Sequence, residues 1–147
     1  MEKELIQAHF KHKTDIQIRF NDVDSFGHVN NNTYFAYYDL GKESYLNTVL
    51  NSDLRTLPIV PVVANISADF ILPIFHGDEI QVETAIIHLG TKSFTLLQQA
   101  VNKKTGAVLC QCKSIMVCFN AKTQQAEDMP DTYRQAILDY EKDNLQA

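Results

Sequence analysis

A single long helix in a chain otherwise patterned for strands is the feature that most constrains the fold. Across residues 31–50 the large side chains recur at intervals of three and four, and Asn30 or Asn31 suits the cap of the first turn. The recurring positions are Tyr34, Tyr37, Tyr38, Gly41, Tyr45, Leu46 and Val49. They place aromatic rings on more than one side, so we expect a helix wrapped by other structure rather than one lying on a surface.

The rest of the chain mostly alternates apolar and polar residues with the period of a strand. Expected strands cover residues 14–20, 59–73, 79–89, 93–101 and 107–119, and a short amphipathic helix follows at about 131–143. This order predicts an α+β fold whose five-stranded antiparallel sheet covers the long helix. The sheet must curl strongly, or a second subunit must complete the burial. We expect one domain over residues 1–147, with its core at about 14–120.

Charge and composition exclude several classes of function. The chain mixes 13 basic with 18 acidic residues, a formal charge of -5, so a nucleic acid is not expected as a partner. No apolar run reaches the roughly 18 residues of a membrane span, and residues 1–6 lack an apolar leader. Cys110, Cys112 and Cys118 show neither a disulfide framework nor metal-ligand spacing. We interpret them as core residues of a soluble protein of the reducing cytoplasm.

The segment between the first strand and the long helix carries the residues best suited to chemistry. Asp24 follows the strand, and residues 25–29 are few enough to leave its carboxylate near the helix start. A helix start offers unsatisfied N–H groups and about half a positive charge, which can hold the oxygen of a polarised carbonyl. A carboxylate can attack that carbonyl or take a proton from attacking water. The pair suits hydrolysis of a thioester, although Asp24 and Asn30 also suit an ordinary turn and cap.

This segment resembles the N-terminal signature of the 4-hydroxybenzoyl-CoA thioesterase-like family, which has the hotdog fold. The matching residues are 19–31 (RFNDVDSFGHVNN), Tyr34, Tyr37, Tyr38 and Asp39, with weaker matches at 63–65, Pro73, 77–78, 90–94 and Gly106. The resemblance implies that Asp24 is the catalytic carboxylate and that the backbone near Asn31 polarises the thioester carbonyl. It implies oxyanion or substrate-binding roles for Gly27, His28, Val29, Asn30 and Asn31.

The same resemblance implies the architecture and the partners. Two copies would pair edge to edge into a homodimer with interface active sites, and dimers would form a homotetramer. The substrate would be a small or medium acyl-CoA, or an acyl carrier protein thioester, and no metal or organic cofactor would be needed. Lys92 and Ser93 match a strand position near the CoA phosphates of relatives, which makes them possible CoA-binding residues. An exposed lysine in a strand is, however, usually only solvated.

Two other functions stay open at the level of sequence. A hotdog hydroxyacyl-thioester dehydratase would pair a histidine such as His28 with an acidic residue of the helix. Asp39 and Glu43 lie on that helix, but we expect them to have structural or dimer-contact roles. A non-catalytic acyl-CoA-binding module would bind without turnover. His28 suits either a substrate contact or a place beside the helix cap, and His76 and His88 are interpreted as turn and strand residues.

Overall fold

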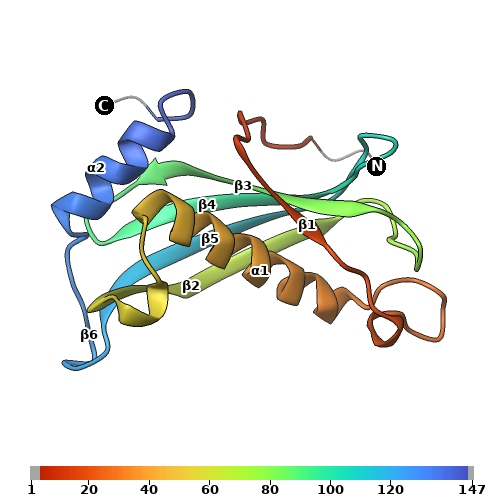
Figure 1. Cartoon of the computed structure of the whole chain (residues 1–147), viewed down its shortest axis with the longest axis horizontal. Helices are drawn as coiled ribbons and strands as arrows, with labels where there is room; N and C mark the ends of the chain where they lie inside the picture. Colours follow the sequence, from red (N-terminus) through yellow and green to blue (C-terminus); the bar gives the residue numbers. More distant parts are fainter. Residues whose placement is uncertain (1–3, 146–147) are drawn as a thin grey trace.

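A computed structural model describes residues 4–145 and shows a curled sheet around one long helix (Figure 1). The elements in chain order are β1 (His12–Ile16), the 3-10 turn η1 (Phe20–Asp22), α1 (Asn31–Leu50), the 3-10 turn η2 (Leu54–Thr56), β2 (Ile59–Phe70), β3 (Ile80–Leu89), β4 (Ser93–Asn102), β5 (Val108–Asn120), β6 (Gln125–Ala126) and α2 (Asp131–Tyr140). The expected domain over 1–147 and the expected lack of a leader in 1–6 include residues 1–3 and 146–147, which lie outside the described residues.

The sheet joins strands that are distant in the sequence. Its order is β1-β3-β4-β5-β2 with every pair antiparallel, and β6 pairs with the end of β5. Figure 1 shows α1 crossing in front of the sheet, with its two ends near opposite ends of the strands and α2 near the C-terminal end of α1. No helix in the described part of the chain is long and apolar enough to cross a membrane.

Local sequence explains the ends of α1 and its close approach to the sheet. The Asn30 side chain accepts a hydrogen bond from Asn32 N–H at 3.0 Å, which caps the first turn. Asn51 ends the helix in the left-handed conformation, with φ of 49°. A Cβ added to Gly41 would lie 2.7 Å from Val82 Cγ1. Glycine at this position therefore lets the helix backbone lie against β3.

Two clusters of buried side chains divide the core along α1. The first surrounds Tyr34 and Tyr38 and includes Ile74. The second surrounds Tyr45 and includes Ile137 of α2. All three cysteines are buried and unbridged, as expected of core residues. The N-terminal half of α1 thus packs near the loop that precedes it, and the C-terminal half packs near α2.

The first strand differs from its predicted bounds of 14–20. It covers only His12–Ile16, and the chain then forms η1. Alternation along a strand over 14–20 places Phe20 on the same face as buried Ile16, but Phe20 is 83% exposed. The cause is Asp22, whose carboxylate accepts Arg19 N–H at 2.9 Å and draws the chain into a turn. An aspartate that bonds to a backbone three residues earlier competes with the ladder of a sheet.

β2 is an edge strand with a large exposed apolar surface. Among the described residues it pairs only with β5, so its other edge carries unpaired backbone groups. Val62, Val63, Ile66 and Phe70 on this strand are between 37% and 46% exposed. The strand ends at Phe70 instead of 73, and its register with β5 shifts between Val63 and Asn65. A long apolar edge of this kind is a surface that soluble proteins normally cover.

Candidate active site

The segment from residue 20 to residue 30, called the entry loop below, folds back on itself as a narrow turn. Val23 and Val29 form an antiparallel bridge, and Asp24 N–H donates to His28 O at 2.9 Å. Gly27 closes the turn with φ of +90°, a conformation that residues with side chains seldom adopt. The turn therefore holds Asp24 beside the residues that lead into α1.

The Asp24 carboxylate is half-buried and has one oxygen engaged. Its Oδ1 accepts Phe26 N–H at 2.9 Å. This bond is typical of an ordinary aspartate turn, and it also fixes the direction of the carboxylate. Within residues 4–145 the other oxygen, Oδ2, has no hydrogen-bond partner. One oxygen is therefore held by the loop while the other is available to water or substrate.

The start of α1 leaves one backbone donor free. Asn30 N–H donates to Asp22 O at 2.9 Å, and Thr33 N–H donates to Asn30 O at 2.9 Å. Asn32 N–H donates to the capping side chain of Asn30. In the part of the chain that the structure describes, Asn31 N–H has no partner. This donor lies at the positive end of the helix dipole, where an oxyanion is stabilised.

A cavity of about 230 Å³ opens at this helix start. Its lining residues are His28, Val29, Asn31, Tyr34, Phe70, Ile71, Leu72 and Pro73. The ring centroids of Tyr34 and Phe70 are 5.1 Å apart, which gives the cavity an aromatic wall. Burial raises the pKa of Tyr34, so its hydroxyl is neutral at physiological pH. The cavity thus combines a free amide donor with an aromatic wall and the apolar side chains of Val29, Ile71 and Leu72.

The residues predicted for this site fall into two groups. His28 and Val29 of the entry loop and Asn31 of α1 line the cavity, whereas Asp24, Gly27 and Asn30 of the same loop do not. The His28 ring lies edge-on to Phe75, with centroids 5.6 Å apart. The entry loop therefore brings the predicted residues to one end of α1, and their chemical roles stay predictions.

Asp22 is the most constrained acidic residue of the entry loop, and the sequence-based prediction gave it no role. It is only 3% exposed, and its carboxylate accepts Tyr37 OH at 2.7 Å, Arg19 N–H at 2.9 Å and Arg19 Nη2 at 3.2 Å. Burial opposes its ionisation, but these hydrogen bonds and the guanidinium charge outweigh burial and lower its pKa. In the sequence, only the nearby Arg19 could have indicated a partner for Asp22. Tyr37 lies 15 residues away, so local spacing does not relate it to Asp22.

Lys92 and Ser93 lie at the opposite end of the sheet from this cavity. Ser93 pairs with Val117, and Val117 in turn pairs with Val62 of β2. Phe70, at the cavity, lies at the other end of β2. The eight residue-to-residue steps from Val62 to Phe70 span about 26 Å at the rise of a strand. One chain therefore does not bring the possible CoA-binding residues together with Asp24.

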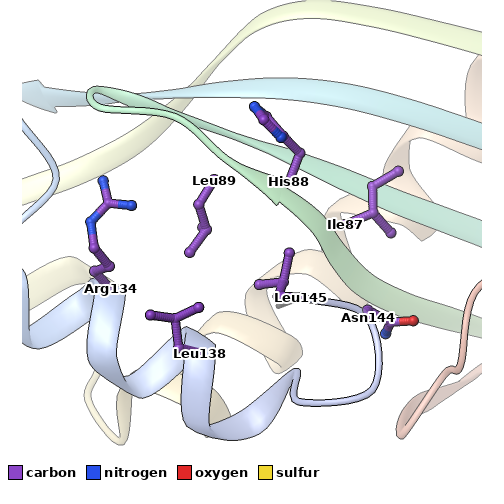
Figure 2. Close-up of a pocket in the computed structure, with 7 residues that line it drawn as sticks. All are labelled: Ile87, His88, Leu89, Arg134, Leu138, Asn144 and Leu145. Atoms are coloured by element: carbon purple, nitrogen blue, oxygen red, sulfur yellow. The ribbon is translucent and has the colours of Figure 1, made fainter. Parts of the chain in front are cut away.

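A larger cavity of about 440 Å³ lies between β3 and α2 (Figure 2). Its lining residues are Ile87, His88, Leu89, Arg134, Leu138, Asn144 and Leu145. None of them is a predicted catalytic or binding residue, and none is a carboxylate or a nucleophile. Arg134 Nη2 donates to Gly90 O at 2.6 Å, which holds α2 against the end of β3. This cavity is larger than the one at the start of α1, but only the smaller one lies beside the candidate catalytic residues.

The remaining candidates lie away from the helix start. Asp39 is exposed and pairs with Lys42 Nζ at 3.3 Å, and Glu43 is also exposed. His76 lies in a turn and His88 in β3, as predicted. Among residues 4–145 no three histidine, cysteine, aspartate or glutamate side chains gather as metal ligands would.

Comparisons with known proteins extend over most of the chain. A model of the thioesterase-like superfamily matches residues 18–137. The long-chain acyl-CoA thioesterase FadM of Escherichia coli is 26% identical over 129 residues, which cover 85% of this chain and 96% of that protein. The protein YsmA of Bacillus subtilis is 27% identical over 128 residues, covering 84% and 82%. A Thermus thermophilus thioesterase solved with coenzyme A and zinc is similar with a TM-score of 0.82 at 25% identity, covering 92% of this chain and 98% of that one. The predicted hotdog fold is confirmed.

Proposed function

Because the chain belongs to the thioesterase-like superfamily and is therefore a thioester hydrolase, we propose that it hydrolyses small or medium acyl-CoA molecules at the start of α1. One observation carries this proposal. The free oxygen of Asp24 lies in the entry loop, and the free N–H of Asn31 lies at the start of the helix into which that loop leads. A carboxylate and an oxyanion donor are the two groups that thioester hydrolysis needs.

The proposed reaction uses the two groups at the same carbonyl. The thioester oxygen accepts Asn31 N–H and gains negative charge as the carbonyl carbon is attacked. Asp24 either takes a proton from the attacking water or attacks the carbon itself, forming an anhydride that water then cleaves. In both routes the C–S bond breaks, CoA leaves as a thiolate, and one water is consumed. The chemistry calls for no cofactor, and Gly27, His28, Val29 and Asn30 serve to shape the binding site.

The exposed edge of β2 supports a homodimer in which each copy completes the site of the other. If two β2 strands pair antiparallel about a two-fold axis near Ile66, Val62 of one copy lies opposite Phe70 of the other. This pairing brings Lys92 of the partner subunit and Ser93 of the partner subunit toward the cavity, where they would contact CoA. It also covers the apolar edge that a monomer leaves exposed.

Two further features support the finer parts of the proposal. Phe20 and Phe26 are 83% and 81% exposed and lie outside the β2 edge, which supports contact between dimers and hence a homotetramer. The three buried, unbridged cysteines suit a reducing cytoplasm.

The size of the cavity supports a small or medium acyl group. About 230 Å³, closed on one side by Tyr34 and Phe70, suits an aromatic ring or a chain of several carbons better than a fully extended long chain. The dehydratase alternative is less favoured, because the first turn of α1 holds no acidic residue to pair with His28.

Release of free thiol from benzoyl-, hexanoyl- and palmitoyl-CoA tests the proposal. We expect hydrolysis with the highest kcat/KM for benzoyl- or hexanoyl-CoA, and hexanoyl-acyl carrier protein tests whether the carrier can be a protein. A preference for palmitoyl-CoA would overturn the proposed size of the substrate. Absence of thiol release from every substrate, with water added to crotonyl-CoA instead, would establish the dehydratase.

A charge placed at the β2 edge tests the dimer. Ile66→Arg should shift the protein to monomers in analytical ultracentrifugation and reduce hydrolysis at least tenfold, because a buried unpaired charge opposes association. Lys122→Glu, at an exposed turn, is the matched surface control and should change neither the oligomeric state nor the rate of hydrolysis. An oligomeric Ile66→Arg protein with full activity would contradict this arrangement.

A further inference from the structure

The side chain and backbone of Asp22 tie three segments of the chain together. Its carboxylate accepts both the backbone N–H and the guanidinium of Arg19, at the exit from β1. The same carboxylate accepts Tyr37 OH at 2.7 Å, on the second turn of α1. Its carbonyl oxygen accepts Asn30 N–H at 2.9 Å, at the helix cap. No other acidic side chain of the entry loop is buried.

These bonds determine the positions of the two groups proposed for the chemistry. Asp24 lies two residues after Asp22 along the chain, so its backbone is held from the Asp22 side. Asn31 follows Asn30, whose N–H is bonded to Asp22, and it lies less than two turns before Tyr37 on the same helix. A displacement of Asp22 would therefore move the Asp24 carboxylate relative to Asn31 N–H.

We propose that Asp22 is a positioning residue which, through Tyr37, aligns the Asp24 carboxylate with the Asn31 amide; this rests on the proposed thioesterase site. Asp22 touches no substrate, because its side chain is buried and its oxygens are occupied by Arg19 and Tyr37. It acts through geometry, and a misplacement on the order of 1 Å can cost about a hundredfold in rate.

Tyr37→Phe tests this role because it removes only the hydroxyl that binds Asp22. The matched control is Tyr45→Phe, a change on the same helix. The Tyr45 hydroxyl donates at 2.6 Å to another buried carboxylate, that of Glu141. We expect Tyr37→Phe to lower kcat for hexanoyl-CoA by about 10- to 100-fold with KM changed less than about threefold. Tyr45→Phe should leave kcat within about twofold of wild type. Equal loss of kcat in both would assign a merely structural role to Tyr37 and overturn the proposal.

A double-variant cycle with Asp24→Asn separates positioning from general destabilisation. If Asp22 and Tyr37 act by placing Asp24, adding Tyr37→Phe to Asp24→Asn should lower the residual kcat by less than about twofold. A second cycle uses Asp22→Asn, which changes the acceptor of the Tyr37 hydroxyl. Adding Asp22→Asn to Asp24→Asn should likewise lower the residual kcat by less than about twofold. Fully additive losses in both cycles would overturn the positioning role while leaving the thioesterase function intact. An Asp24→Asn enzyme as active as wild type would instead overturn the proposed mechanism and this inference with it.

Discussion

The two ends of α1 use the same pair of groups for different purposes. At the N-terminal end Tyr37 donates to the buried carboxylate of Asp22, and at the C-terminal end Tyr45 donates to the buried carboxylate of Glu141. The O–O distances are 2.7 Å and 2.6 Å. Burial raises the pKa of both tyrosines, and the adjacent carboxylates raise it further, so both hydroxyls stay donors.

The difference lies in what each carboxylate holds. Asp22 belongs to the entry loop beside the cavity, so its bond with Tyr37 ties the segment that carries Asp24 to α1. Glu141 accepts Ile86 N–H at 2.7 Å where β3 shifts register, and Asn144 Nδ2 at 3.1 Å after α2. It therefore joins elements that the second core cluster already packs together. The same bond orders a reactive loop at one end and stabilises the fold at the other.

Glu141→Ala should have the largest effect on stability. It leaves Tyr45 OH and Ile86 N–H without an acceptor in the core, and each such group costs about 1–3 kcal/mol. We expect a loss of about 4 kcal/mol in the free energy of unfolding, measured by urea denaturation, with kcat per folded molecule unchanged. A variant that loses activity but keeps its stability would reverse the roles assigned to the two ends.

Tyr34→Leu should change selectivity at the N-terminal end. Loss of the ring opens the wall that Tyr34 forms with Phe70, so longer acyl chains gain room. The ratio of kcat/KM for palmitoyl-CoA to that for hexanoyl-CoA should rise by about 30-fold, within the range for pocket contacts of this kind. Leu46→Val, in the second cluster, is the control and should leave the ratio unchanged. An unchanged ratio in Tyr34→Leu would place the acyl group elsewhere.

The smallest effect expected is a pH dependence of stability from Asp22. Its pKa in the folded protein lies below the ordinary value of 3.8, so its carboxylate contributes stability above that value and loses it as pH falls through the folded pKa. The difference in unfolding free energy between wild type and Asp22→Asn should be on the order of 1 kcal/mol at pH 7 and shrink below about pH 4. Urea denaturation at pH 7, 4 and 3 measures it. A difference independent of pH would show that the charge of Asp22 does not matter.

The local pattern was enough to predict most of the fold. The spacing of Tyr34, Tyr38 and Tyr45 indicates α1. The prediction of Asn30 as a candidate cap is confirmed, because its side chain accepts a hydrogen bond from Asn32 N–H in the first turn. The prediction of a strand through Phe20 is wrong because alternation continues past Ile16 in the sequence, whereas the hydrogen bond from Arg19 N–H to Asp22 turns the chain.

The contacts that escaped prediction join residues that are distant in the sequence. Asp22 and Tyr37 are 15 residues apart, and Glu141 and Tyr45 are 96 apart, so no periodicity relates them. The position of Lys92 at the far end of the sheet likewise follows only from the strand register. Asp24 and Asn31 were found because the turn that joins them is short and local.

Thiol release from hexanoyl-CoA by wild type, Asp24→Asn and Asp39→Asn tests the proposed site most directly. Asp39→Asn is the matched control. Asp39 is an exposed aspartate on α1 that pairs with Lys42, and it lies outside the entry loop. We predict that Asp24→Asn lowers kcat at least about a hundredfold with an unchanged circular dichroism spectrum, and that Asp39→Asn stays within about twofold of wild type. Wild-type kcat in a folded Asp24→Asn protein would contradict the assignment of the chemistry to the entry loop.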